Sequence, residues 1–203
     1  MRSYYRANHI KSKYSRVYIL IVMQPSSPVV IRRPSGMIAG LTAAWAIFGL
    51  FLAIDSELSL PPGSLYKMVG LAFGIPSSYA VYLGFTLYLV TAVIIGIAYS
   101  TISKQIKILN INSLIKGLAT GILAGVIVWA VLFLPLNYGL MQPTLQKMLS
   151  SVNHNSEEYI LAKQFLQLSS TIFFGSLALH IVFGGVMGFC ARLAVANTSV
   201  VHD

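Results

Sequence analysis

Four long runs of the sequence contain no Asp, Glu, Lys or Arg, and this feature constrains the fold more than any other. The runs cover residues 36–54, 79–103, 117–146 and 164–191. A helix needs about 20 apolar residues to cross the hydrocarbon core of a bilayer. The sequence therefore predicts an all-α integral membrane protein whose four transmembrane helices lie at 36–54, 79–101, 117–137 and 169–191.

The composition supports a membrane protein and argues against a nucleic-acid-binding one. Hydrophobic residues make up 56% of the chain and charged residues only 9%, whereas a soluble domain has about 25% charged residues. The net charge of +9 comes from basic residues that flank the apolar runs, so no separate basic domain is present to bind nucleic acid. We expect the lipid bilayer as a partner. The single cysteine, Cys190, excludes an internal disulfide.

The distribution of Lys and Arg predicts the orientation in the cell membrane, because these residues are enriched in cytoplasmic segments. Only three lie in the two loops that follow the first and third runs: Lys67, Lys147 and Lys163. The other eleven are Arg2, Arg6, Lys11, Lys13, Arg16, Arg32, Arg33, Lys104, Lys107, Lys116 and Arg192. Both termini are therefore expected in the cytoplasm.

The first 35 residues are expected to form a basic cytoplasmic arm that lies on anionic headgroups. Two alternatives remain open. The apolar run at 17–23 after a basic start could belong to a secretory signal. Translation could also begin at Met23, which would leave residues 1–22 outside the native protein.

The two halves of the chain share three similar segments in the same order. Residues 64–69 (SLYKMV) match 144–149 (TLQKML), residues 87–97 match 179–189, and glycines spaced by four open the first and third runs. The pattern predicts a tandem repeat of a two-helix hairpin with an outer loop. Since each unit crosses the membrane twice, the copies are parallel and related by an axis along the membrane normal.

This repeat predicts the organisation of the whole chain. Hairpin one covers 36–103, a basic cytoplasmic loop 104–116, hairpin two 117–194 and a tail 195–203.

Small residues at four-residue spacing indicate where helices approach closely in lipid. One stripe consists of Gly117, Gly121 and Gly125, and a second of Gly184 and Gly188. Ala92 and Gly96 occupy the matching positions of the second span. These stripes either close the bundle itself or dock another subunit.

The expected spans contain no carboxylate, Lys or Arg, which proton-coupled carriers and ion channels usually need. His180 is the only histidine inside a span. It could serve as a proton relay or metal ligand, or be a neutral histidine bonded to a neighbouring helix. No second His, Cys or acid lies at helical spacing from it.

The second outer loop holds a candidate metal site, in which His154 would bind together with Glu157 or Glu158. The alternative is a turn followed by a helix that Ser156 caps and whose dipole the two acids complement. No cofactor is expected.

The outer loops, 55–78 and 138–168, are half apolar and cannot stay bare in water. They must pack on each other, lie in the interface or dock a partner. The second is expected to contain a short helix from Pro143 and a longer one after Ser156 that runs straight into the fourth span.

Residues 117–125 (GLATGILAG), Leu134-Pro135 and 179–188 (LHIVFGGVMG) resemble the glycine-rich hairpins of small archaeal and bacterial membrane proteins. Over residues 36–195, size and span number are similar to those of the small accessory membrane subunits of archaeal ammonia monooxygenase. The resemblance implies a non-catalytic helical subunit beside copper-bearing partners, and it assigns no functional residue.

Three hypotheses follow for function. A non-catalytic accessory subunit would co-purify with other integral membrane subunits. A small-solute channel or carrier would line one cavity with the hydroxyl groups of its spans, which are Thr42, Thr86, Tyr88, Thr91, Thr120 and Ser176. A membrane enzyme with a metal at His154 or His180 would need at least three convergent ligands.

Overall fold

The computed structural model describes residues 35–106, 109, 111–151 and 153–199. The predicted basic arm, with its alternative start at Met23, lies outside these residues apart from Ser35. Within the described ranges, all regular secondary structure is helical, which confirms the all-α prediction.

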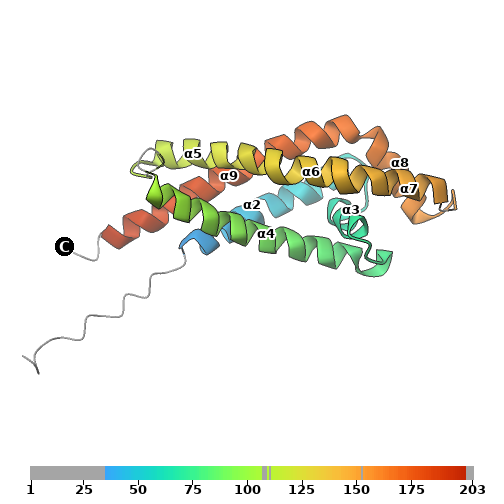
Figure 1. Ribbon diagram of the computed structural model, residues 1–203, viewed down its shortest axis with the longest axis horizontal. Coiled ribbons are helices and arrows are strands. Elements are labelled where there is room, and N and C mark those ends of the chain that lie inside the picture. The colour runs from blue at the N-terminus through green and yellow to red at the C-terminus, as the bar shows by residue number, and fades with distance from the viewer. Residues whose placement is uncertain (1–34, 107–108, 110, 152, 200–203) are drawn as a thin grey trace, which may run out of the picture. The chain divides into compact units, whose positions relative to one another are not determined.

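Within these described residues, four helices are long and apolar enough to cross a membrane, as the sequence predicts (Figure 1). The first is α2 (Ser35–Glu57), the second α4 (Ser77–Gln105) and the fourth α9 (Ser169–Ser199). The third is composite and consists of α5 (Leu114–Val128), η2 (Trp129–Phe133), α6 (Leu134–Leu136), η3 (Asn137–Met141) and α7 (Gln142–Ser151).

The predicted end of the third span at Asn137 is wrong, because the helix continues without a break as far as α7. Pro135 lacks an N–H, and its ring clashes with the carbonyl four residues earlier. The π-helical turns η2 and η3 lie on either side of it, and such turns let a helix absorb a local disruption of its hydrogen-bond ladder. The expected loop from Tyr138 therefore starts only after α7.

The outer loops pack on each other, which was one of the three outcomes expected for them. α3 (Ser64–Ala72) comes from the first loop, and α8 (Glu157–Gln167) from the second. Together with α7 they enclose a separate apolar core. It comprises Leu60, Met68, Met141, Leu145, Met148, Leu161, Ala162 and Phe165.

The helix that follows Ser156 does not run straight into the fourth span. The backbone at Leu168 leaves the α-helical conformation (φ −92°, ψ 9°), and α9 begins at the next residue. The helix start agrees with the sequence, since the Ser156 hydroxyl accepts a hydrogen bond from the Tyr159 amide at 3.2 Å.

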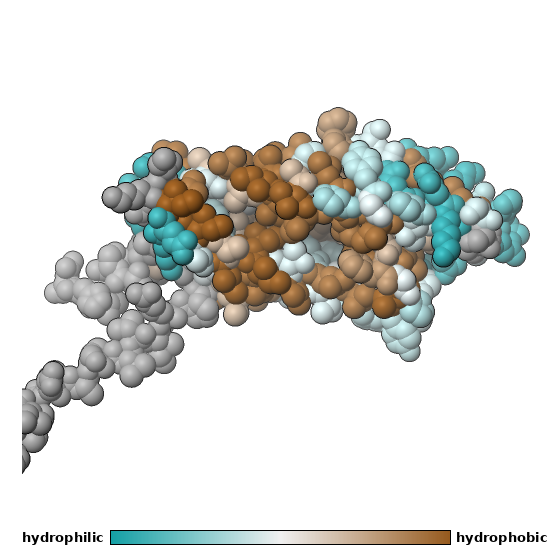
Figure 2. Space-filling model, viewed as in Figure 1, coloured by the Kyte–Doolittle hydropathy of each residue, from teal (hydrophilic) through white to brown (hydrophobic). Residues whose placement is uncertain are grey.

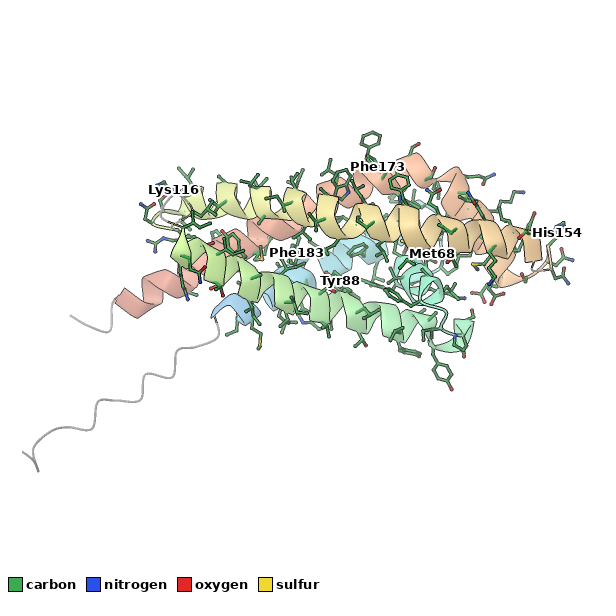
Figure 3. The ribbon with its side chains drawn as sticks, viewed as in Figure 1. Met68, Tyr88, Lys116, His154, Phe173 and Phe183 are labelled. Carbon is green, nitrogen blue, oxygen red and sulfur yellow. The ribbon has the colours of Figure 1, made fainter. Side chains whose placement is uncertain are left out.

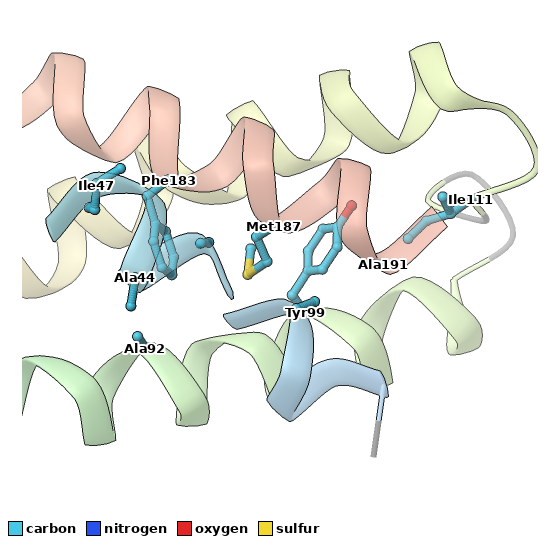
Figure 4. Close-up of a cluster of buried hydrophobic side chains, with 10 residues drawn as sticks. Ala44, Ile47, Ala92, Tyr99, Ile111, Phe183, Met187 and Ala191 are labelled. Carbon is cyan, nitrogen blue, oxygen red and sulfur yellow. The ribbon is translucent and has the colours of Figure 1, made fainter. Parts of the chain in front are cut away.

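The bundle has its own core, which small and apolar side chains fill (Figure 4). α2 packs along both α4 and α9, and α5 packs along α9, whereas α4 and α5 meet only briefly. That contact includes Tyr99 of α4, whose hydroxyl lies 2.8 Å from the Thr120 hydroxyl of α5. The core residues are Ala39, Ala43, Ala44, Ile47, Ala92, Tyr99, Ile111, Phe183, Met187 and Ala191.

The outward faces of the long helices are strongly apolar. Large side chains such as Ile94, Leu123 and Ile127 are more than half exposed. Figure 2 shows apolar residues dominating the face formed by α4 and α5, with hydrophilic residues gathered toward its ends. Such a surface is suited to contact with lipid or with other membrane helices.

Candidate functional site

The glycine stripe of α5 meets the glycine stripe of α9 along a seam of direct backbone contact. A Cβ added at Gly121 would collide with the carbonyl oxygen of Gly184, and one added at Gly125 with that of His180. At Gly117 an added Cβ would lie 2.9 Å from the Gly188 carbonyl oxygen. These glycines therefore pack helices inside the bundle.

α2 and α4 form a second seam of the same kind. A Cβ at Gly40 would collide with the Ala92 carbonyl oxygen, and one at Gly36 would lie 2.6 Å from that of Gly96. One further turn along, the Tyr88 hydroxyl donates to the Ala44 carbonyl at 2.7 Å.

His180 bonds within its own helix and not to a neighbouring one. Its Nδ1 lies 2.7 Å from the Ser176 carbonyl oxygen, and its ring is 6.0 Å from that of Phe133. The Trp129 indole donates to the Ser176 hydroxyl at 2.9 Å. This polar group links η2 to α9 without bringing a second metal ligand to His180.

The candidate metal ligands of the second outer loop have separate partners. Glu157 forms an ion pair with Lys67 of α3 at 2.6 Å, and the His154 ring lies 4.6 Å from that of Tyr159 at an angle of 37°. The pKa of Glu158 is lowered by its own backbone amide, then by the Ser77 hydroxyl and the charge of Lys67. Across the described ranges, no group of three His, Cys, Asp or Glu side chains converges.

Several hydroxyl groups of the spans face outward or bond within their own helix. Thr42 and Thr86 are exposed on the outside of the bundle, and Thr86 bonds to the carbonyl of Tyr82 in its own helix. Thr120 bonds to the Lys116 carbonyl in its own helix. With the bundle core filled by apolar side chains, this arrangement counts against a channel along the axis.

The most unusual polar group is Asp55, which the sequence analysis placed in a loop. It lies in the last turn of α2, within the first span, and is 0% exposed. Its Oδ2 accepts a hydrogen bond from the Gly63 amide at 2.8 Å, and the amides of Ser64 and Leu65 lie beside the carboxylate. Asp55 thus caps α3 from another helix, where the helix dipole favours negative charge.

The loop conformation makes this cap possible. Gly63 has φ +84°, a left-handed conformation that costs glycine little. In addition, the Ser64 hydroxyl donates to the Pro61 carbonyl at 2.6 Å. Together these features direct the first amides of α3 toward Asp55.

Tyr66 lies beside Asp55 in a cluster of aromatic rings between α2, α3 and α4. Its ring is 5.3 Å from that of Phe51 and 5.4 Å from those of Phe85 and Tyr88. Tyr66 is buried, and neither its hydroxyl nor Oδ1 of Asp55 has a hydrogen-bond partner among the described residues. Burial raises the pKa of the Tyr66 hydroxyl, and the charge of Asp55 raises it further.

Sequence reasoning missed this pair because it ended the first span at Ile54, one residue before the acid. An available signal was the Pro-Pro-Gly turn at 61–63, which can bring a following helix back toward the end of the span. The candidate site is therefore Asp55 with Tyr66, where the end of α2 meets the start of α3.

Among the described residues, the fold has four helices long and apolar enough to cross a membrane, and a buried carboxylate lies at the end of α2. Comparison with protein-family models, with curated proteins and with solved structures gives no match to this chain.

Proposed function

We propose that this chain is a non-catalytic subunit of a larger membrane protein complex, embedded in the cell membrane with both termini in the cytoplasm. One observation carries the proposal, and it concerns the outward face of α2. That face bears a line of exposed small residues spaced by four, three and four: Thr42, Ala46, Gly49 and Ala53. A Cβ built on Gly49 would have nothing within 4 Å.

Small residues on a membrane helix are useful where another helix packs closely. The seams of α2 with α4 and of α5 with α9 use such residues for backbone contact. α2 also exposes the large side chains of Ile38, Trp45 and Leu50 beside this line. The outward face of α4 carries large side chains at successive turns, including Val90, Ile94 and Ile97. The small-residue line of α2 is therefore better suited to a partner helix than to lipid.

We also propose that the two hairpins are parallel copies of one unit. Three matching contacts support this. Gly36 and Gly96 correspond to Gly117 and Gly188, Gly40 and Ala92 to Gly121 and Gly184, and Ala44 and Tyr88 to Gly125 and His180.

The spacing of the copies agrees with the proposed duplication. Lys147 follows Lys67 by 80 positions, but His180 follows Tyr88 by 92. The extra 12 positions are close to the 11 residues of α8, for which hairpin one has no counterpart in the described structure.

The charge at the two ends supports the proposed orientation. Lys104, Lys116 and Arg192 lie at the end of the bundle where α4 ends and α5 begins. Lys67, Lys147 and Lys163 lie at the opposite end, together with Glu57, Glu157 and Glu158. Figure 3 shows Lys116 and His154 at these opposite ends. Eight further Lys and Arg precede α2 or lie between α4 and α5 in the sequence, and an excess of these residues is typical of the cytoplasmic side.

The test is affinity purification from native membranes in mild detergent, with wild type and two matched variants. Gly49→Leu fills the small-residue line, while Gly175→Leu places the same side chain on α9, where an added Cβ also meets nothing within 4 Å. We expect wild type and Gly175→Leu to retain the same stoichiometric membrane partners and Gly49→Leu to lose them.

The identity of those partners tests the resemblance as well. Mass spectrometry that finds copper-bearing ammonia monooxygenase subunits would support that particular complex. A wild-type protein that leaves native membranes as a stable monomer would contradict the subunit proposal.

A further inference from the structure

Within the part of the chain that the structure describes, two buried side-chain polar atoms lack a hydrogen-bond partner, and they belong to the same site. These atoms are Oδ1 of Asp55 and the hydroxyl oxygen of Tyr66. Both residues are more than nine-tenths buried. Burying a polar group without a hydrogen bond costs the full free energy of its desolvation. Two such groups in one site therefore point to one ligand that bonds to both.

The fold brings the two residues to the same place. Oδ2 of Asp55 accepts from the amide of Gly63, three residues before Tyr66, and the Tyr66 ring lies 5.3 Å from that of Phe51, one helical turn before Asp55 in α2. Their other neighbours offer little hydrogen bonding. Tyr66 is surrounded by the rings of Phe48, Phe51 and Phe85, and the Tyr88 hydroxyl is already bonded to the Ala44 carbonyl. A ligand that satisfies either atom is therefore most favourable where it satisfies both.

The chemistry of the two atoms limits what that ligand can be. Oδ1 of an ionised Asp55 only accepts a hydrogen bond, whereas the Tyr66 hydroxyl both donates and accepts. Ca²⁺ takes six to eight oxygen ligands and Mg²⁺ requires an octahedron, which two oxygen atoms do not supply. A neutral molecule that donates to Asp55 and also bonds to Tyr66 fits both atoms.

We propose that Asp55 and Tyr66 hold one bridging water molecule at the outer end of hairpin one. Water donates to Oδ1 of Asp55 and accepts from the Tyr66 hydroxyl. It joins the cap of α3 to the aromatic cluster between α2 and α4. The site lies close to the loop at 61–63, from which water can enter.

The test is a double-mutant cycle on the full-length protein in detergent, with thermal unfolding as the readout. Asp55→Asn keeps an oxygen that can accept from the Gly63 amide, and Tyr66→Phe removes only the hydroxyl. We expect Tyr66→Phe to lower Tm clearly in wild type and much less in Asp55→Asn, because the bridge is already weakened there. An equal loss of Tm in both backgrounds would overturn the proposal.

The matched control is Tyr99→Phe, which removes a hydroxyl bonded to Thr120 near the opposite end of α4. Its loss of Tm should be the same in the wild-type and Asp55→Asn backgrounds. If Na⁺, K⁺ or Ca²⁺ raises the Tm of wild type but not that of Asp55→Asn, the ligand is a cation and not water. This result would also overturn the proposal.

A second measurement decides the question if Asp55→Asn does not fold. A high-resolution density map of the wild-type protein should show a peak within about 3.2 Å of both oxygen atoms. Clear density for both side chains with no peak between them would contradict the bridge.

Discussion

Gly121 of α5 and Gly184 of α9 face each other so closely that a Cβ on either would collide with the carbonyl oxygen of the other. We therefore predict that Gly184→Val separates the two helices and lowers stability by more than the roughly 1–3 kcal/mol that is typical of overpacking. Thermal unfolding and the size-exclusion profile in detergent measure the effect. Gly175→Val in the same helix is the control, since no atom lies within 4 Å of its added Cβ. Equal stability of the two variants would contradict the seam.

Because Asp55 caps α3, substitutions at Asp55 should lower the stability of the protein by different amounts. Asp55→Ala leaves the Gly63 amide without its acceptor and should destabilise the protein by about 1–3 kcal/mol. Asp55→Asn retains an acceptor and should cost less. Chemical or thermal unfolding of the purified protein compares the two. An alanine variant as stable as the asparagine variant would show that the cap contributes nothing.

The ion pair between Lys67 and Glu157 should contribute little, although it joins the two outer loops. The Glu157 side chain is 69% exposed and that of Lys67 only 12%, so water screens the pair from one side. Glu157→Gln should cost at most about 1 kcal/mol, and less in high salt. A larger loss that persists in high salt would mean that the pair is shielded from solvent.

Glu158, the second acidic residue of α8, should make the stability of the protein depend on pH. Because the pKa of Glu158 is lowered in the folded protein, its ionised form stabilises the fold at pH values above its ordinary pKa. This contribution is lost as the pH falls through the lowered value. Tm should therefore fall less steeply in Glu158→Gln than in wild type as the pH drops below about 4. Identical profiles for the two proteins would show that ionised Glu158 does not stabilise the fold.

Hydropathy and glycine spacing were sufficient to predict the long helices and the residues of the α5–α9 seam. Both patterns are local, and lipid leaves few alternatives for a long apolar run. The continuation of the third helix past Pro135 was not predictable in this way, because a proline followed by polar residues is equally typical of a helix end. The break at Leu168 is likewise set by the packing of α8 on α7, which spacing along the chain does not encode.

Asp55 shows the same limit at the candidate site. An acid at the end of an apolar run normally indicates the membrane surface, and only the return of α3 buries it. Tyr66 likewise gives no sign in the sequence that it lies among the rings of Phe51 and Phe85. These contacts depend on how α3 packs between α2 and α4.

The most direct test of the central proposal is site-specific photo-crosslinking in native membranes. A photoreactive residue at Ala46, within the small-residue line of α2, is compared with one at Ile94, on the outward face of α4. Crosslinking of a discrete partner protein from position 46, with lipid adducts alone from position 94, is the predicted result. Lipid adducts alone from both positions would contradict a subunit that binds its partner through α2.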